Sequence, residues 1–200
     1  MLIVETDDFF KTVKEKGMSF DQWMGKIEKI ESKEKVLKYF KESEFISKKY
    51  TPQLKELTYK QYLVAIAADW CGDCQRNVPI LEHICKISNL LEFILLKKED
   101  NLDLLLKSNG GEKIPYVMFY SRDGYFVTNW IERSYESYKF TASTFRKFRY
   151  EKNEELFKFY SEAYEKQKTS MIQSTANEII HMILKVNAVQ GASTRINKAL

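Results

Sequence analysis

The chain has 200 residues, with 32 lysines and arginines against 28 aspartates and glutamates, and a formal net charge of +4. Because charges of both signs are interspersed, we expect a solvated surface and no nucleic-acid partner. The three cysteines are too few, and odd in number, for a disulfide framework. This count excludes the class of small disulfide-stapled domains and favours a reducing compartment.

Acidic residues, Glu5, Asp7 and Asp8, stand close to the N-terminus. The segment lacks the basic and apolar regions of a signal peptide. The longest apolar runs, such as that at 63–68, fall far short of the roughly 20 residues that span a bilayer. We therefore expect a cytoplasmic protein with no membrane contact.

The first part of the chain shows helical periodicity. One short helix is followed by a second that Ser19 is predicted to cap, in which apolar residues recur every three or four residues as far as Ile30. A third helix would carry apolar residues on one side as far as Phe45. Pro52 marks a break, because proline cannot continue a helix without losing a hydrogen bond. We expect residues 1–55 to form an N-terminal helical extension packed on the core.

The middle of the chain alternates between strand and helix patterns. Residues 62–67 are a continuous apolar run of strand length, as expected for a strand covered on both faces. Asp123-Gly124 supplies the positive φ of a tight turn and predicts a hairpin. The predicted order is strand 62–67, helix 74–89, strand 91–96, a leucine-rich helix capped by Asp100 or Asn101 and closed by Gly110-Gly111, strand 116–120 and strand 125–130.

Two more helices are predicted near the C-terminus, at about 142–166 and 170–186. Together they form a C-terminal helical extension over residues 141–190. After Gln190 the periodicity is lost, and residues 191–200 are predicted to be a loose tail. We expect the apolar stripes of both extensions to face the core, with a dimer surface or a lid that selects partners as the alternative.

Two cysteines, Cys71 and Cys74, follow the buried strand at the spacing Cys-x-x-Cys. If Cys71 ends the strand region and Cys74 lies one turn into the next helix, the helix N-terminus favours the thiolate of Cys71. A thiolate attacks a disulfide and forms a mixed disulfide, which the second thiol then resolves. Trp70 offers a flat apolar shoulder for a bound peptide. The pattern therefore predicts a redox pair.

A zinc site is the first alternative, and an inert structural pair is the second. Zinc needs two more ligands, and the remaining candidates are Cys85, His83 and His181. Cys85 lies roughly 16 Å along the predicted helix from Cys74, at 1.5 Å per residue, which is too far to share one metal. We expect Cys85 to be a small buried hydrophobe, both histidines to be surface or helix-face residues, and no metal or cofactor to be bound.

These residues resemble the thioredoxin superfamily over about residues 56–140. Trp70-Cys71-Gly72-Asp73-Cys74 matches the active-site motif Trp-Cys-Gly-Pro-Cys in four of five places. Pro79 falls where thioredoxins carry a proline in the active-site helix. Ile114-Pro115 resembles the family's dipeptide with a cis bond, and Asp123-Gly124 lies at the hairpin that follows.

The resemblance implies an α/β fold with a central mixed sheet of four to five strands, flanked by helices. It implies that Cys71 is the nucleophile and Cys74 the resolving thiol, within an active-site loop of Trp70, Gly72 and Asp73. It also implies that Pro115 lies against the dithiol and that the backbone of Ile114 pairs with a bound peptide.

Two residues depart from the family pattern. Ala65 occupies the position of a buried aspartate that assists proton transfer at the resolving thiol, so Cys74 must use water or another group, such as Lys97 or Lys98. Asp73 replaces a proline, and its carboxylate should raise the pKa of Cys71. The alternative is that Asp73 only favours the helix N-terminus through the dipole.

We expect a thiol–disulfide oxidoreductase that reduces protein or small-molecule disulfides and is recycled by an electron donor of the thioredoxin-reductase type. The alternative is a thioredoxin-like binding or adaptor module with little turnover. Residues 130–133 end the last strand, near where the family's substrate groove lies. We expect them either to shape the specificity for the substrate or to be ordinary residues at the edge of the sheet.

Overall fold

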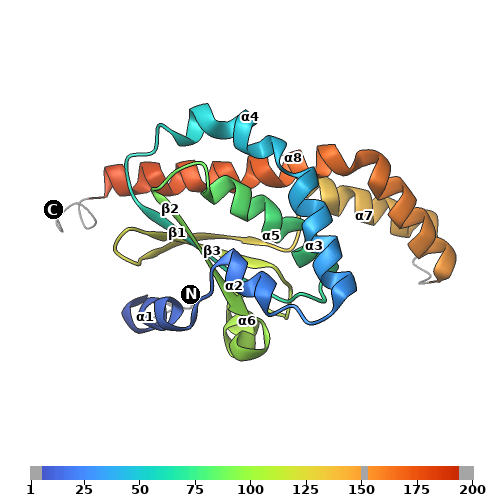
Figure 1. The fold of residues 1–200 in the computed structure, drawn as a ribbon, viewed down its shortest axis with the longest axis horizontal. Coiled ribbons are helices and arrows are strands. Elements are labelled where there is room, and N and C mark those ends of the chain that lie inside the picture. The colour runs from blue at the N-terminus through green and yellow to red at the C-terminus, as the bar shows by residue number, and fades with distance from the viewer. Residues whose placement is uncertain (1–5, 150–152, 194–200) are drawn as a thin grey trace.

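The computed structural model describes residues 6–149 and 153–193 (Figure 1). Its centre is a mixed four-stranded sheet with the strand order β2-β1-β3-β4. β1 pairs in parallel with β2, and β3 is antiparallel to both β1 and β4. The strands are β1 (Gln61–Ala67), β2 (Leu91–Lys97), β3 (Tyr116–Ser121) and β4 (Phe126–Ile131). The predicted thioredoxin-like α/β fold is confirmed, with four strands.

Helices cover both faces of the sheet. α5 and α8 pack on one face, and α3 and α4 pack over α5 from outside. α1 and α2 contact β2 from the other side, where α6 also lies (Figure 1). The helices are α1 (Thr6–Lys16), α2 (Phe20–Gly25), α3 (Ile30–Glu42), α4 (Phe45–Leu54), α5 (Gly72–Cys85), α6 (Leu102–Asn109), α7 (Tyr135–Lys147) and α8 (Glu154–Ala192), with a 3-10 turn at Glu99–Asn101.

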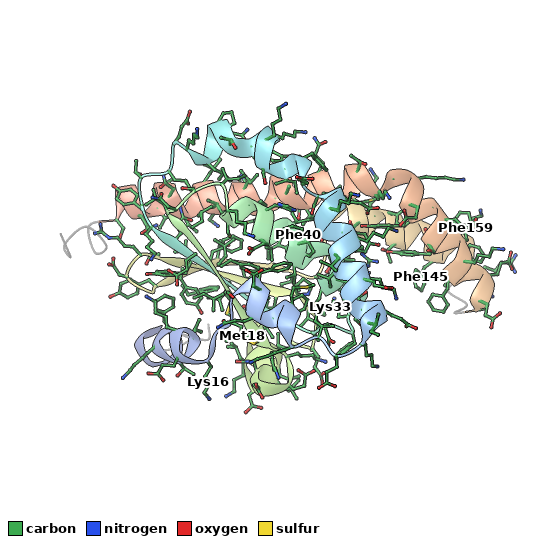
Figure 2. The ribbon with its side chains drawn as sticks, in the orientation of Figure 1. Lys16, Met18, Lys33, Phe40, Phe145 and Phe159 are labelled. Carbon is green, nitrogen blue, oxygen red and sulfur yellow. The ribbon has the colours of Figure 1, made fainter. Side chains whose placement is uncertain are left out.

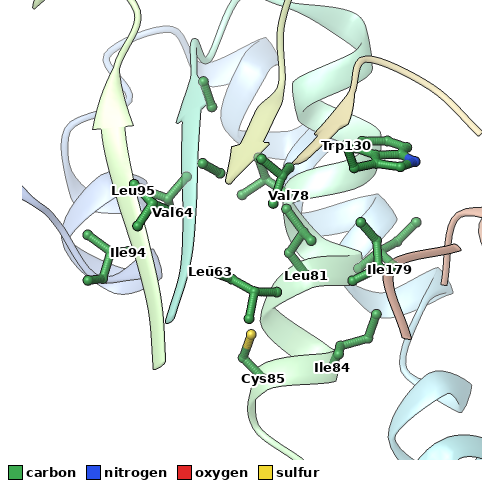
Figure 3. Packing of buried hydrophobic residues seen from close by; sticks show 14 of the residues in the cluster. Leu63, Val64, Val78, Leu81, Ile84, Cys85, Ile94, Leu95, Trp130 and Ile179 are labelled. Atoms are coloured by element: carbon green, nitrogen blue, oxygen red, sulfur yellow. The ribbon is translucent and has the colours of Figure 1, made fainter. Parts of the chain in front are cut away.

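The core lies between the sheet and α5. All seven residues of β1 are buried, which explains why this strand is apolar without alternation: it is central in the sheet and covered on both faces. Figure 3 shows Leu63 of β1 facing Leu81 and Cys85 of α5, with Ile179 of α8 on the far side of α5. Ile179 is fully buried in the same cluster, so α8 is part of the core that supports the site.

The N-terminal helices differ from the sequence prediction in their boundaries. α2 ends at Gly25, so Ile30 does not lie on the apolar side of that helix; it begins α3 and is 74% exposed. Phe45 begins α4 instead of continuing α3. Pro52 lies inside α4, which ends two residues later. A proline near the end of a helix removes a single hydrogen bond, and tertiary packing of the buried α4 residues outweighs that loss.

The C-terminal helices also differ from the prediction. The helix predicted at about 142–166 is not continuous: α7 ends at Lys147, and α8 begins at Glu154. Asn153 caps α8 by accepting a hydrogen bond from the Leu156 amide at 2.8 Å. The predicted break near Ser170 does not exist, because α8 continues through it to Ala192. Apolar residues on both sides of Ser170 therefore share one helix. The predicted loose tail begins inside this helix, and its residues 194–200 lie outside the described part of the chain.

Within residues 6–149 and 153–193, none of the helices combines the length and the apolar character needed to cross a bilayer.

Replacing Ile179 by alanine should destabilise the protein by about 2–5 kcal/mol, because the change leaves a cavity in a fully buried cluster. Leu184→Ala on the same helix is the matched control; Leu184 is 40% exposed, so we expect a change of no more than about 0.5 kcal/mol. Denaturant unfolding monitored by circular dichroism measures both. Equal effects of the two variants would contradict the placement of α8 in the core.

Candidate active site

The two cysteines lie where the chain passes from the buried strand β1 into the helix α5. Cys71 is the N-cap residue of α5, with extended backbone angles, and Cys74 lies in the first turn. The side chain of Cys71 is half-buried, whereas Cys74 is fully buried behind it. One sulfur can therefore meet a substrate, and the other can meet only Cys71.

The two thiols have opposite acidities. The pKa of Cys71 is lowered to about 7, chiefly by a side-chain hydrogen bond from Cys74; burial opposes this effect, and the backbone amides of Cys74 and Asp73 support it. The pKa of Cys74 is raised well above its ordinary value, first by burial and then by Cys71. Near neutral pH, Cys71 is thus partly ionised beside a protonated Cys74.

Asp73 is buried and paired with two arginines. Its Oδ1 lies 2.5 Å from Nη2 of Arg76, and its Oδ2 lies 2.6 Å from Nη2 and 2.9 Å from Nε of Arg133. Burial works against the charged carboxylate, but Arg133 and Arg76 together lower the pKa of Asp73 below its usual value. Asp73 therefore remains charged across the neutral range.

The carboxylate of Asp73 acts on Cys71 in the direction predicted from the sequence, because its charge raises the pKa of Cys71. The hydrogen bonds to the sulfur outweigh this effect, so the net pKa is lowered. Asp73 also lies in the first turn of α5, where a negative charge favours the helix dipole. The two interpretations of Asp73 are thus compatible.

The loop before β3 lies against the reactive sulfur. The Ile114–Pro115 peptide bond is cis, which confirms the expectation from the resemblance. The Cys71 thiol lies 3.7 Å from the carbonyl oxygen of Ile114, to which it donates. The amide of Glu132 donates to the carbonyl of Pro115 at 2.8 Å. The end of β4 and the Ile114–Pro115 loop therefore hold each other beside Cys71.

Glu132 turns the chain directly after β4. It adopts φ 63°, a left-handed conformation that is uncommon for a residue other than glycine. Its carbonyl accepts a hydrogen bond of 3.0 Å from the Asn77 side chain on α5. This turn brings Arg133 to Asp73, so two of the edge residues at 130–133, Glu132 and Arg133, contact the active-site helix directly.

Trp70 precedes the reactive cysteine and is 54% exposed. Its indole Nε1 lies 3.4 Å from Glu99, and the Lys98 ammonium lies 5.1 Å from the ring centroid. Lys98 donates to Glu112 at 2.6 Å. Lys98 therefore contacts Trp70 and Glu112 at the surface. It does not replace the aspartate that is missing near Cys74.

The remaining candidates from the sequence are structural. Ala65 is fully buried, and Cys85 is buried as expected. His83 is buried, not on the surface; its Nε2 lies 2.7 Å from the Phe40 carbonyl and its ring stacks on Phe40. In the part of the chain that the structure describes, no three His, Cys, Asp or Glu side chains are grouped to hold a metal ion.

The sequence did not lead us to predict that Arg76 and Arg133 pair with Asp73. Asp73 and Arg76 are three residues apart on one helix, and opposite charges at that spacing are a recognisable signal. Arg133 is 60 residues from Asp73, and no local pattern indicates that the two meet.

Asp73→Asn should lower the pKa of Cys71 below about 7, because it removes the negative charge that opposes the thiolate while both arginines stay positive. The ultraviolet absorbance of the thiolate as a function of pH measures this pKa. Asp123→Asn, in the turn after β3, is the control and should leave the pKa unchanged. An unchanged or raised pKa in Asp73→Asn would show that the carboxylate does not act on Cys71.

Comparison with known proteins agrees with this geometry. A family model described as thioredoxin matches residues 17–146. The fold is similar to that of PA1234, a protein of unknown function from Pseudomonas aeruginosa, with a TM-score of 0.66 and 16% identity, covering 86% of this chain and 95% of that one. It is also similar to an HIV epitope-scaffold, with a TM-score of 0.63 and 16% identity, covering 92% and 98%. No curated protein matches the chain. Because the family model spans more than half of the sequence, from before α2 into α7, the chain belongs to the thioredoxin family.

Proposed function

We propose that the protein is a thiol–disulfide oxidoreductase that reduces disulfides through Cys71 and Cys74. The observation that carries the proposal is the asymmetry of the pair: a half-buried thiol with a pKa of about 7 in front of a fully buried one. The thiolate of Cys71 attacks a substrate disulfide and releases the first substrate thiol. Cys74 then attacks Cys71, releases the second thiol and leaves the internal disulfide.

The surroundings of Cys71 support a role in substrate binding. Trp70 offers an exposed aromatic face on one side of the sulfur. Gly72 leaves the approach open, since a Cβ there would meet only Arg76 nitrogens, at 3.8 and 3.9 Å. Ile114 and Pro115 are the residues we expect to receive the peptide backbone of a protein substrate. In a reducing compartment, a donor of the thioredoxin-reductase type would regenerate the dithiol.

The step that Cys74 performs is the slow one in this proposal. Cys74 is fully buried with a raised pKa, and position 65 offers it alanine instead of a carboxylate. Its proton must then leave through water or through the departing thiolate. The same observation favours the second candidate, a binding module, because a mixed disulfide that resolves slowly holds its partner.

Cys71→Ser should reduce the rate of insulin disulfide reduction by dithiothreitol to the uncatalysed rate, because the attacking thiolate is lost. Cys74→Ser should instead accumulate a mixed disulfide between Cys71 and its substrate, visible on a non-reducing gel. Cys85→Ser is the matched control and should retain activity, since Cys85 is buried on the last turn of α5. Activity of Cys71→Ser equal to that of the parent would end the proposal.

A rapid-mixing measurement distinguishes a reductase from a binding module. The pre-reduced protein is mixed with a peptide disulfide, and samples are quenched in acid at increasing times. For a reductase we expect the mixed disulfide to appear and then decay to the internal Cys71–Cys74 disulfide. A mixed disulfide as long-lived as that of Cys74→Ser would favour the binding module.

A further inference from the structure

A cavity lies between α5, the residues after β4, α7 and the start of α8. Its volume is about 230 Å³. Two guanidinium groups line it, together with hydroxyls and aromatic rings, and we call it the arginine cavity. Its lining includes Arg76, Arg133, Thr141, Phe145, Phe157 and Tyr160. Figure 2 shows Phe145 at the end of the molecule formed by α7 and the first turns of α8.

The charges around the arginine cavity are balanced. Arg76 and Arg133 line it and face two carboxylates, Asp73 and Glu132. Lys113 contacts Glu132 but does not line the cavity. Glu132 lies 3.3 Å from Arg133 but 3.9 Å from Lys113, and it also accepts a hydrogen bond from a tyrosine hydroxyl. The guanidinium N–H groups that remain without a partner, and not an excess of charge, are therefore what the cavity offers to a ligand.

Both guanidinium groups have donors left for a ligand. A guanidinium carries five N–H donors. Arg76 uses Nη2 for Asp73, and Arg133 uses Nε and Nη2; within residues 6–149 and 153–193, Nε and Nη1 of Arg76 and Nη1 of Arg133 have no protein acceptor. The two side chains stay 18% and 23% exposed. Such donors suit a carboxylate, which a guanidinium binds through paired hydrogen bonds.

Two contacts link the arginine cavity to the segments around Cys71. Nη1 of Arg76 lies 3.8 Å from the position of a Cβ on Gly72, the residue that follows Cys71. Arg133 follows Glu132, whose amide is bonded to Pro115. The cavity is smaller than the 300–1,000 Å³ typical of drug-sized ligand pockets. It therefore has room for the short acidic arm of a small molecule and not for a folded segment.

We propose that the arginine cavity binds the carboxylate of a low-molecular-weight disulfide and makes anionic small disulfides the preferred substrates of Cys71. This rests on the proposed function. Cys71 Sγ attacks one substrate sulfur; the substrate S–S bond breaks, and the first thiolate leaves and takes up a proton. Cys74 Sγ then displaces the second thiolate. Two electrons pass from the dithiol to the substrate, and the protein keeps the Cys71–Cys74 disulfide.

Three disulfides that each carry two methylene groups between the sulfur and the polar group test the preference. They are 3,3′-dithiodipropionate with two carboxylates, bis(2-hydroxyethyl) disulfide with none, and cystamine with two ammonium groups. Each is mixed in excess with the pre-reduced protein, and the second-order rate constant of a single turnover is followed by the fluorescence of Trp70 and the other tryptophans. We expect the dicarboxylate to react about tenfold faster than the neutral disulfide, the size of one charge-assisted hydrogen bond, and cystamine to react slowest. Equal rates for all three would overturn the proposal.

Two charge-removing variants locate the effect. Arg133→Gln should lower the ratio of the dicarboxylate rate to the neutral rate by about tenfold. The ratio is the useful quantity because any change in the reactivity of Cys71 itself cancels between the two substrates. Lys147→Gln, on α7 but outside the arginine cavity, is the matched control and should leave the ratio unchanged. An equal fall in both variants would mean long-range attraction and would overturn the proposal.

A binding measurement separates this proposal from the proposed function. Cys71→Ser combined with Cys74→Ser has no thiol at the site, so 3,3′-dithiodipropionate can bind it without reacting. We expect its addition to shift the amide NMR signals of Gly72, Asp73 and Thr141, and the neutral disulfide to leave them in place. Binding without reduction by the parent protein would contradict the proposed function alone. Reduction by the parent without these shifts would contradict the cavity proposal alone.

Discussion

The buried carboxylate of Asp73 is the interaction on which the geometry of the site depends. A charge removed from water needs a counter-charge close by, since an unpaired buried carboxylate is far less stable than a paired one. Arg76 supplies one from the same helix, and Arg133 supplies the second from beyond β4. Because Arg133 must reach Asp73, the chain turns sharply at Glu132, and that turn also binds the Pro115 carbonyl. One ion-pair cluster thus joins the active-site helix to the loop that faces Cys71.

The same cluster moderates the chemistry of the dithiol. A bare aspartate two residues from Cys71 would oppose the thiolate strongly, whereas an aspartate shared by two guanidinium groups opposes it weakly. The hydrogen bond from Cys74 and the amides at the start of α5 then decide the net acidity of Cys71. The pKa of Cys74, by contrast, is raised, because this thiol is buried. Ala65 stands where the resemblance to thioredoxins implies a carboxylate that would assist its deprotonation.

The helices beyond the sheet have two different roles. Part of α8 packs beside α5 against the sheet, and its Ile179 belongs to the core (Figure 3). α7 and the first turns of α8 extend past the sheet (Figure 1). They line a cavity together with Arg76 and Arg133, the arginines that hold Asp73. These helices therefore both stabilise the fold and line the cavity beside the active-site helix.

The sequence by itself determined the strands of the sheet, the hairpin turn and the position of the dithiol. These features follow from local rules: an unbroken apolar run for the buried β1, a glycine with positive φ at residue 124, and cysteines one helical turn apart. The helix boundaries near Ile30 and Ser170 were not determined locally, because packing decides where an amphipathic segment starts and stops. Only the tertiary structure brought Arg133 to Asp73 across 60 residues and buried His83 against α3. The pKa of Cys71 also depends on the tertiary structure, since the burial of a sulfur and the charges near it depend on which distant segments fold around it.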